Sequence, residues 1–268
     1  MPIQFPHKPG IIAYFTIGDP DLATSKKIAL AAIDAGADVL ELGVPFSDPL
    51  ADGPVIQRAS ERALLHGTRL TDVLALAGEL RAERPQVGLV IFSYLNPILR
   101  LGMEKFCTLA QQAGVDGVLV TDMIVEEAEE YRSAMRRHKL QPIFLAAPTS
   151  PDERLEKIAK ASEGFVYAIS RTGITGTQQQ VADGAQQLVE RIRCHTQLPI
   201  AIGFGISSAA HVAAVGQFAD AAVIGSAIVA IIEKSTPAEA PAAVAAFLTG
   251  LGVKPVRDLE TAAIPSRR

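Results

Sequence analysis

Residues 35–54 read AGADVLELGVPFSDPLADGP, and this stretch contains the pattern on which the fold prediction rests. Gly36 is suited to end a helix because glycine adopts the left-handed conformation at little cost. The run Asp38–Leu42 that follows is apolar and short, as a strand of a buried parallel sheet is. It leads directly into a loop rich in proline, glycine and aspartate. A helix end, a strand and a polar loop in this order make up one step of a βαβ chain.

The same step recurs along the chain, with AGVD at residues 113–116 and FAD at residues 218–220. Short apolar runs alternate with segments of helix-forming composition, which is typical of a parallel sheet. The eight runs are Ile11–Ile17, Asp38–Leu42, Val87–Ser93, Gly117–Val120, Pro142–Ala146, Phe165–Ile169, Pro199–Ile202 and Ala221–Ile224. Each unit averages about 33 residues, close to the roughly 30 of a βαβ unit. Eight even units without a linker predict an α/β fold, a single (β/α)8 TIM barrel over residues 1–268, with a loosely held tail at 254–268.

Composition excludes several classes of protein. The formal net charge is -4, aromatic residues make up 5% and tryptophan is absent, so the chain offers neither a basic field nor stacking platforms for nucleic acid. The longest uncharged apolar stretch, Ala221–Ile232, is too short to span a bilayer, and the N-terminus lacks a signal sequence. Cys107 and Cys194 are predicted to be reduced thiols in the core. We therefore expect a cytoplasmic protein that binds neither nucleic acid nor membrane.

In a TIM barrel the chemistry lies at the strand ends and in the loops after them, and the run Asp38–Leu42 has Glu41 near its end and two aspartates in the loop that follows. Glu41 is expected to point into the barrel, where desolvation raises the pKa of a carboxyl toward acid/base use. A structural glutamate paired with an arginine or with backbone amides is the alternative. Asp48 and Asp52 fit two interpretations. In the first, both are common turn residues, and Asp52 could cap a helix that begins at Pro54. In the second, Asp52 acts with Glu41 as an acid and base pair.

Three glycine-containing loops follow later strands. Residues 170–176 combine glycines with hydroxyl groups, as expected of a mobile lid or an anion-binding turn, and a plain connector is the alternative. Gly203–Ser207 and Gly225–Ser226 follow the seventh and eighth strands, where barrels commonly bind phosphate. A short helix starting near Ser226 would direct its positive end at the anion. We therefore predict a phosphate site after strands seven and eight.

The residue types present narrow the chemistry further. All five histidines fall outside the predicted loops, and no His, Asp and Glu cluster has metal-binding spacing. No lysine lies in a predicted strand, so the nucleophile of a Schiff-base enzyme is missing. The sequence predicts acid/base chemistry on a small phosphate ester, without a metal and without a cofactor.

The motifs taken together resemble a known family. The segment ELGVPFSDPLADGP at residues 41–54 is similar to the signature of tryptophan synthase alpha subunits. The resemblance extends in order through Tyr14–Pro20, Ser170–Gly176, Gly203–Ser207 and Gly225–Val229, from about residue 10 to about residue 250. It implies a lyase of tryptophan biosynthesis that cleaves indole-3-glycerol phosphate by a retro-aldol reaction to indole and glyceraldehyde 3-phosphate.

The resemblance also implies roles for individual residues. Glu41 would be the general acid/base at indole C3, Asp52 would accept the indole N–H, and Thr175 would orient Asp52 from the lid. The phosphate-binding positions would be Gly176, Gly205, Gly225 and Ser226. The indole pocket would be lined by Tyr14, Ile56, Leu119, Tyr167 and Phe204, although each of these is equally compatible with an ordinary core position.

A partner is implied as well. The family assembles with a beta subunit as an α2β2 heterotetramer, and the implied contact surface contains Asp48 and Pro49 and the segments near Asn96 and at residues 122–127. Ile124 stands where the family usually has proline, which predicts weaker binding. The helix that usually precedes the first strand is also missing, so the barrel floor should be closed in another way. A partner-independent lyase and a non-catalytic barrel that activates a partner remain alternatives.

Overall fold

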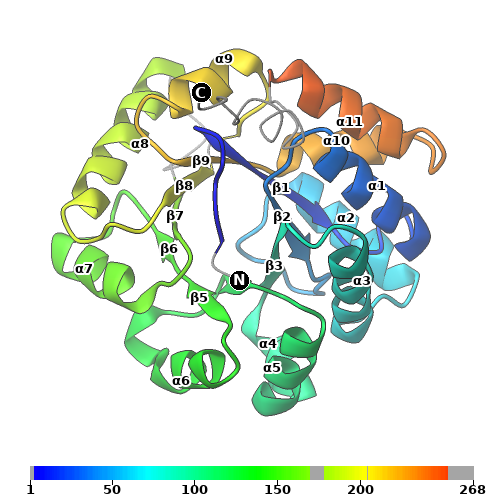
Figure 1. Ribbon diagram of the computed structural model, residues 1–268, viewed down its shortest axis with the longest axis horizontal. Coiled ribbons are helices and arrows are strands. Elements are labelled where there is room, and N and C mark those ends of the chain that lie inside the picture. The colour runs from blue at the N-terminus through cyan, green and yellow to red at the C-terminus, as the bar shows by residue number, and fades with distance from the viewer. Residues whose placement is uncertain (1–2, 170–177, 204, 253–268) are drawn as a thin grey trace, which may run out of the picture.

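In the computed structural model, which describes residues 3–169, 178–203 and 205–252, parallel strands form a nearly closed barrel that is surrounded by helices (Figure 1). The strand order is β5-β4-β3-β2-β1-β9-β8-β7-β6. The strands are β1 (Gly10–Thr16), β2 (Val39–Gly43), β3 (Gly88–Ser93), β4 (Gly117–Val120), β5 (Gln141–Ile143), β6 (Leu145–Ala146), β7 (Val166–Ile169), β8 (Ile200–Gly203) and β9 (Ala221–Ile224). The predicted TIM barrel is therefore confirmed.

The predicted strand Pro142–Ala146 is the place where the barrel closes. It is divided at Phe144 into β5, which pairs with β4, and β6, which pairs with β7. The Phe144 carbonyl still accepts a hydrogen bond from the Tyr167 amide, at 3.1 Å. One run of chain thus joins both ends of the sheet, and eight predicted strands appear as nine elements.

Helices cover the outside of the barrel (Figure 1). They are α1 (Leu22–Asp34), α2 (Pro54–Leu65), α3 (Leu70–Glu83), α4 (Leu95–Leu101), α5 (Met103–Gln112), α6 (Glu129–Arg137), α7 (Asp152–Ala161), α8 (Gln178–Arg193), α9 (Ala209–Val215), α10 (Ser226–Lys234) and α11 (Ala240–Gly250), with a 3₁₀ turn at Val125–Glu127. The helix predicted near Ser226 is α10. Gly36 and Gly114 have φ values of 104° and 71°, which confirms their left-handed role after α1 and α5. No helix within these described ranges is long and apolar enough to cross a bilayer.

The aspartate that ends each repeated motif joins neighbouring strands at their N-terminal ends. Its carboxylate accepts a backbone N–H from the first or second residue of the adjacent strand, and it also faces a basic side chain. The sets of aspartate, amide and base are Asp38 with Ile11 and His7, Asp116 with Leu89 and Arg81, and Asp220 with Ile200 and Arg193. A charge-assisted bond to an amide that the sheet leaves unpaired favours one register. The repeated motif therefore aligns β1 with β2, β3 with β4, and β8 with β9.

Apolar side chains of the N-terminal segment cover the floor of the barrel. Ile3 is buried against Ile143 and Phe165 in the cluster that fills the barrel interior. Phe5 packs edge-on against Phe165, with 6.0 Å between ring centroids. Figure 1 shows the dark blue segment that precedes β1 crossing the middle of the barrel. Two apolar side chains of this segment thus cover surface that the strands alone would leave open to water.

The prediction for the two cysteines is half wrong. Cys107 is buried on α5, as expected, but Cys194 is exposed. Cys194 follows the last residue of α8, and its thiol donates to the Glu190 carbonyl one turn earlier, at 3.4 Å. At this point the chain is leaving the helix on the solvent side, so no core side chain covers the sulfur.

Replacing Ile3 with alanine should destabilise the fold substantially. Ile3 is 6% exposed, and removing a buried isoleucine side chain costs about 2–5 kcal/mol in the free energy of unfolding. The control is Ile124→Ala, since Ile124 is 42% exposed and the same change there should cost no more than about 0.5 kcal/mol. Urea denaturation of both variants measures the difference. Equal losses would show that the N-terminal segment does not close the floor.

Candidate active site

Glu41 is an isolated carboxyl group inside the barrel. It lies on β2 between Val39 and Gly43, and because side chains alternate along a strand it shares the inward face of Val39. Its side chain is 0% exposed, and neither carboxylate oxygen has a hydrogen-bond partner. Burial raises the pKa of Glu41 to about 8. The alternative of a structural glutamate paired with an arginine or an amide is therefore wrong, and the group is protonated near neutral pH.

Tyr14 forms one wall beside this carboxyl. It is the register partner of Glu41 on β1, and its ring packs edge-on against Phe92 at 4.9 Å between centroids. A Cβ atom at Gly43 would lie 2.7 Å from the Tyr14 hydroxyl, and one at Gly225 would lie 3.2 Å from the Tyr14 ring. A side chain at Gly43 would therefore displace the tyrosine, and one at Gly225 would press against its ring. Tyr14 thus connects the region of Glu41 to the start of α10.

Tyr167 occupies a similar place on β7. A Cβ atom at Gly203 would lie 2.7 Å from its hydroxyl, so a second glycine on a neighbouring strand makes space for a second ring. Burial, and then the charges of Glu41, Tyr14 and Asp52, hold the pKa of Tyr167 well above its usual range. Two of the predicted wall residues, Tyr14 and Tyr167, therefore lie within electrostatic reach of both candidate catalytic carboxyls.

Asp52 does not cap a helix. The N-cap of α2 is Gly53, without a side-chain hydrogen bond. The Tyr94 hydroxyl instead donates to Asp52 Oδ2 at 3.0 Å. Burial raises the pKa of Asp52 to about 6, and the bond from Tyr94 opposes that rise. The pKa values of Glu41 and Asp52 are thus separated, which provides an acid and a base in one region of the barrel mouth.

Asp48, on the same loop, has a different environment. It is exposed, and the Ser47 hydroxyl donates to its Oδ2 at 2.5 Å. Ordinary turn chemistry accounts for this residue.

The predicted phosphate positions lie at the C-terminal ends of β8 and β9. Gly225 is the N-cap of α10, and Ser226, its first residue, is exposed. Gly205 is exposed too and has a φ of 62°, a conformation that glycine adopts without strain. The first N–H groups of α10 have no partner within their own helix and can bind an anion.

The remaining predicted residues are placed as follows. Leu119 is fully buried in the barrel interior, and Ile56 is half-buried on α2, where it packs against the core between barrel and helices. Phe204 and the whole of the lid predicted at residues 170–176, which includes Thr175 and Gly176, lie outside the described residues.

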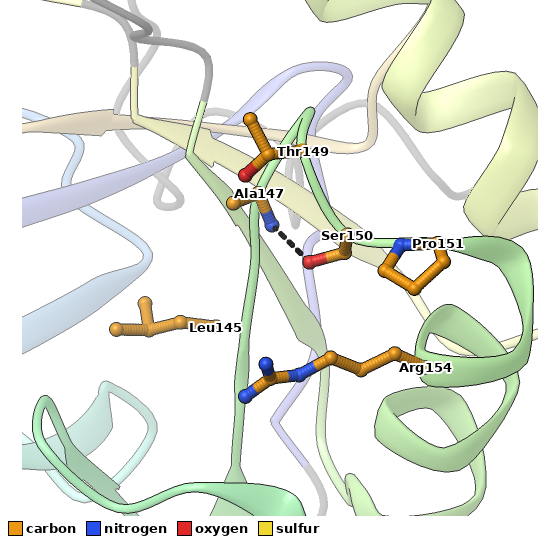
Figure 2. A pocket seen from close by; sticks show the side chains of 6 residues that line it. All are labelled: Leu145, Ala147, Thr149, Ser150, Pro151 and Arg154. Atoms are coloured by element: carbon orange, nitrogen blue, oxygen red, sulfur yellow. Dashed lines mark hydrogen bonds between the residues drawn. The ribbon is translucent and has the colours of Figure 1, made fainter.

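A pocket of about 210 Å³ lies where β6 leads into α7 (Figure 2). Its lining residues are Leu145, Ala147, Thr149, Ser150, Pro151 and Arg154. Leu145 is the register partner of Tyr167, so the pocket borders the Tyr167 side of the barrel. In Figure 2 the Arg154 side chain extends toward the strand that carries Leu145. Its guanidinium also pairs with Glu126 at 3.5 Å.

Sequence reasoning missed Tyr94. This residue directly follows β3, at the strand end where barrels place their chemistry, and that position was a usable signal. Its side chain reaches Asp52, which is 42 positions away along the chain. In the described part of the chain, no three His, Cys, Asp or Glu side chains are grouped so as to hold a metal ion.

Comparison with known proteins agrees with this geometry. The profile of the family described as "Tryptophan synthase alpha chain" matches residues 3–253. The chain belongs to the tryptophan synthase alpha chain family. The tryptophan synthase alpha chain of Solibacter usitatus is 48% identical over 234 residues, which is 87% of each chain. The prediction made from residues 41–54 is thus confirmed.

Solved structures of tryptophan synthase share the fold. One from Mycobacterium tuberculosis has a TM-score of 0.84 and 36% identity, and the match covers 92% of this chain and 93% of the other. A tryptophan synthase complex from Pyrococcus furiosus has a TM-score of 0.82 and 35% identity, with 91% of this chain and 98% of the other covered. The match therefore extends over nearly the whole barrel of the alpha chain family.

The free energy of unfolding should decrease as pH rises, because Glu41 holds its proton more tightly in the folded state than in the unfolded state. Its pKa is about 8 in the folded chain and 4.5 ordinarily, so between these values the folded state binds more protons than the unfolded state. Stability should fall by up to about 1.4 kcal/mol per pH unit, and Glu41→Gln should remove this fall. Urea denaturation from pH 6.5 to 8 isolates the effect, because Asp52 has mostly titrated by then.

The control for this experiment is Glu61→Gln, which changes an exposed glutamate on α2 and should keep the wild-type slope. A wild-type slope in Glu41→Gln would show that the Glu41 carboxyl is hydrated or paired in solution.

Proposed function

We propose that Glu41 and Asp52 catalyse the retro-aldol cleavage of indole-3-glycerol phosphate to indole and glyceraldehyde 3-phosphate, the lyase reaction of the family to which the chain belongs. The observation that carries the proposal is the buried, unpartnered carboxyl of Glu41. A buried polar group without a partner costs free energy, and functional sites are where proteins tolerate that cost. Its pKa of about 8 keeps a proton available at neutral pH.

The steps follow from the two carboxyls. Glu41 donates its proton to indole C3, which leaves a positive charge centred on the ring nitrogen. The Glu41 carboxylate then removes the proton of the adjacent glycerol hydroxyl. As the aldehyde C=O forms, the carbon–carbon bond to C3 breaks and its electron pair restores the aromatic ring. Asp52 accepts the indole N–H and stabilises the transient positive charge. Glu41 ends the cycle protonated, so no cofactor is required.

The substrate phosphate would bind at the start of α10. Backbone N–H groups at Gly225 and Gly205 and the Ser226 hydroxyl supply neutral donors, and the helix dipole favours an anion there. The packing of Gly225 on Tyr14 sets the distance between this site and the region of Glu41. A non-catalytic barrel would have no use for an unpaired carboxyl inside its core, so we favour an enzyme over the activator alternative.

We further propose that the chain binds a tryptophan synthase beta subunit and forms an α2β2 heterotetramer. Three large apolar side chains are exposed on the three segments implied as the contact surface: Leu50 at 93%, Leu99 at 57% and Ile124 at 42%. Large apolar side chains that stay exposed to water are candidates for a protein contact. Leu50 lies two residues from Asp52, so a bound partner would also restrain the catalytic loop. The solved complex from P. furiosus supports such an assembly.

Glu41→Gln should fold and lose lyase activity. The amide keeps the shape of the carboxyl but cannot transfer a proton, so we expect kcat to fall by about 10²–10⁴-fold. Asp52→Asn should lose about 10²–10³-fold, because an amide cannot offset the ring charge. Indole release from indole-3-glycerol phosphate measures both effects. The controls Glu61→Gln and Asp34→Asn alter exposed carboxylates on outer helices and should retain wild-type kcat. Normal turnover in Glu41→Gln would refute the proposed function.

Titration of the cognate beta subunit should raise kcat for indole release and yield a complex with the mass of two chains of each kind. Leu50→Asp should raise the Kd by at least about tenfold, because it places a charge in the apolar contact. Leu65→Asp is the matched control, since Leu65 is 86% exposed but lies at the end of α2, outside the implied surface. Fast turnover without a partner and no complex in the mass measurement would instead establish a partner-independent lyase.

A further inference from the structure

Tyr94 makes two hydrogen bonds to the loop between β2 and α2. Its hydroxyl donates to Asp52 Oδ2 at 3.0 Å and accepts the backbone N–H of Ala51 at 2.9 Å. A phenol has one proton to donate, so the bond from Ala51 directs that proton toward Asp52. The side chain of Tyr94 is nearly enclosed, with 5% of the residue exposed, although Ala51 itself is exposed.

The ring of Tyr94 makes a third contact with the same loop. It packs against Phe46, with 5.0 Å between ring centroids and 31° between ring planes. Phe46 lies near the beginning of the loop and Asp52 near its end. Tyr94 therefore restrains both ends, by packing at one and by hydrogen bonds at the other.

Tyr94 is itself held firmly. It follows the last residue of β3, and the buried Ser93 hydroxyl donates to the Tyr94 carbonyl at 2.9 Å. The next residue, Leu95, donates its N–H to Asp122 Oδ1 at 2.8 Å, which ties the start of α4 to the loop after β4. A side chain fixed by the barrel itself is suited to orient a group on a loop.

A second buried tyrosine shows what a purely structural role would involve. Tyr131 on α6 is 2% exposed and donates to the backbone carbonyl of Val118 at 2.9 Å. That bond joins a helix to a strand and touches no carboxyl. Tyr94 differs because its acceptor is a carboxylate to which the proposed reaction assigns a role.

We propose that Tyr94 is a positioning residue for Asp52. The Tyr94 hydroxyl holds Oδ2 of Asp52 and leaves Oδ1 of the same carboxylate to accept the indole N–H. The inference rests on the proposed function of Asp52. A donor to the carboxylate also favours the ionised form, so the bond from Tyr94 counteracts the rise that burial imposes on the pKa of Asp52. Tyr94 thus orients the Asp52 carboxylate and favours the ionised form that the transition state needs.

The test is Tyr94→Phe, which removes the hydroxyl and keeps the ring against Phe46. We expect kcat to fall by about tenfold with KM within about twofold, because the lost interaction matters most where ring charge develops. The acidic limb of the pH–kcat profile should move up by about half a unit to one unit. The pKa of Asp52, followed by carboxyl-carbon NMR in the free chain, should rise by a similar amount. Tyr131→Phe should leave the profile and the pKa of Asp52 unchanged.

Two further variants distinguish a positioning role of Tyr94 from a general loosening of the loop between β2 and α2. In an Asp52→Asn background, Tyr94→Phe should cause no additional loss of kcat, since Tyr94 acts through the carboxylate. Phe46→Leu weakens the ring contact but keeps the hydroxyl, so the acidic limb should stay at its wild-type position. This variant also tests the loop if Tyr94→Phe folds poorly.

The outcomes distinguish this inference from the function on which it rests. Wild-type kcat in Asp52→Asn would refute the role of Asp52 itself. An inactive Asp52→Asn beside a Tyr94→Phe variant with wild-type kcat and pH profile would overturn only the positioning role. An equal loss from Tyr94→Phe in both backgrounds would also overturn it, because the tyrosine would then act independently of Asp52.

Discussion

The buried carboxyl of Glu41 is the constraint on which the arrangement of the barrel mouth depends. An acid without a hydrogen-bond partner is tolerable in an apolar interior only when it is neutral, and its raised pKa keeps it so. The surroundings are adapted to this state. Gly43 and Gly203 make room for two tyrosine rings that exclude water without offering the carboxyl a cation. A basic residue in this space would lower the pKa of Glu41, and the carboxyl would then lack the proton that the proposed reaction requires.

The two ends of the barrel divide stability from chemistry. At the N-terminal ends of the strands, carboxylates such as Asp38 and Asp116 are bonded to amides and face basic side chains, and the N-terminal segment covers the floor with Ile3 and Phe5. At the C-terminal ends, the carboxyl of Glu41 has no partner. The hydrogen-bonded carboxylates at the N-terminal ends can offset the free-energy cost of the unpartnered carboxyl at the C-terminal ends. Carboxyl groups therefore serve opposite purposes at the two ends.

One loop connects the proposed catalysis with the proposed partner. The segment at residues 44–53 carries Asp52, whose carboxylate is bonded to Tyr94, and Leu50, which is almost completely exposed. A protein bound over Leu50 would restrict the same short segment that Tyr94 holds from inside. Restraint from both sides lowers the entropy that the loop loses when it orders around a substrate. Activation by the partner therefore needs no long pathway through the barrel.

Local patterns in the sequence determined the strands, the glycine-ended helices, the family and the inward direction of Glu41, because strand alternation and turn chemistry depend on neighbours along the chain. The tertiary structure alone decided whether Glu41 is paired, whether Asp52 caps a helix, and whether Cys194 is covered. Each of these depends on groups that are distant in sequence. Tyr94 reaches Asp52 across 42 positions only because β2 and β3 are neighbours in the barrel, and no local pattern encodes that distance.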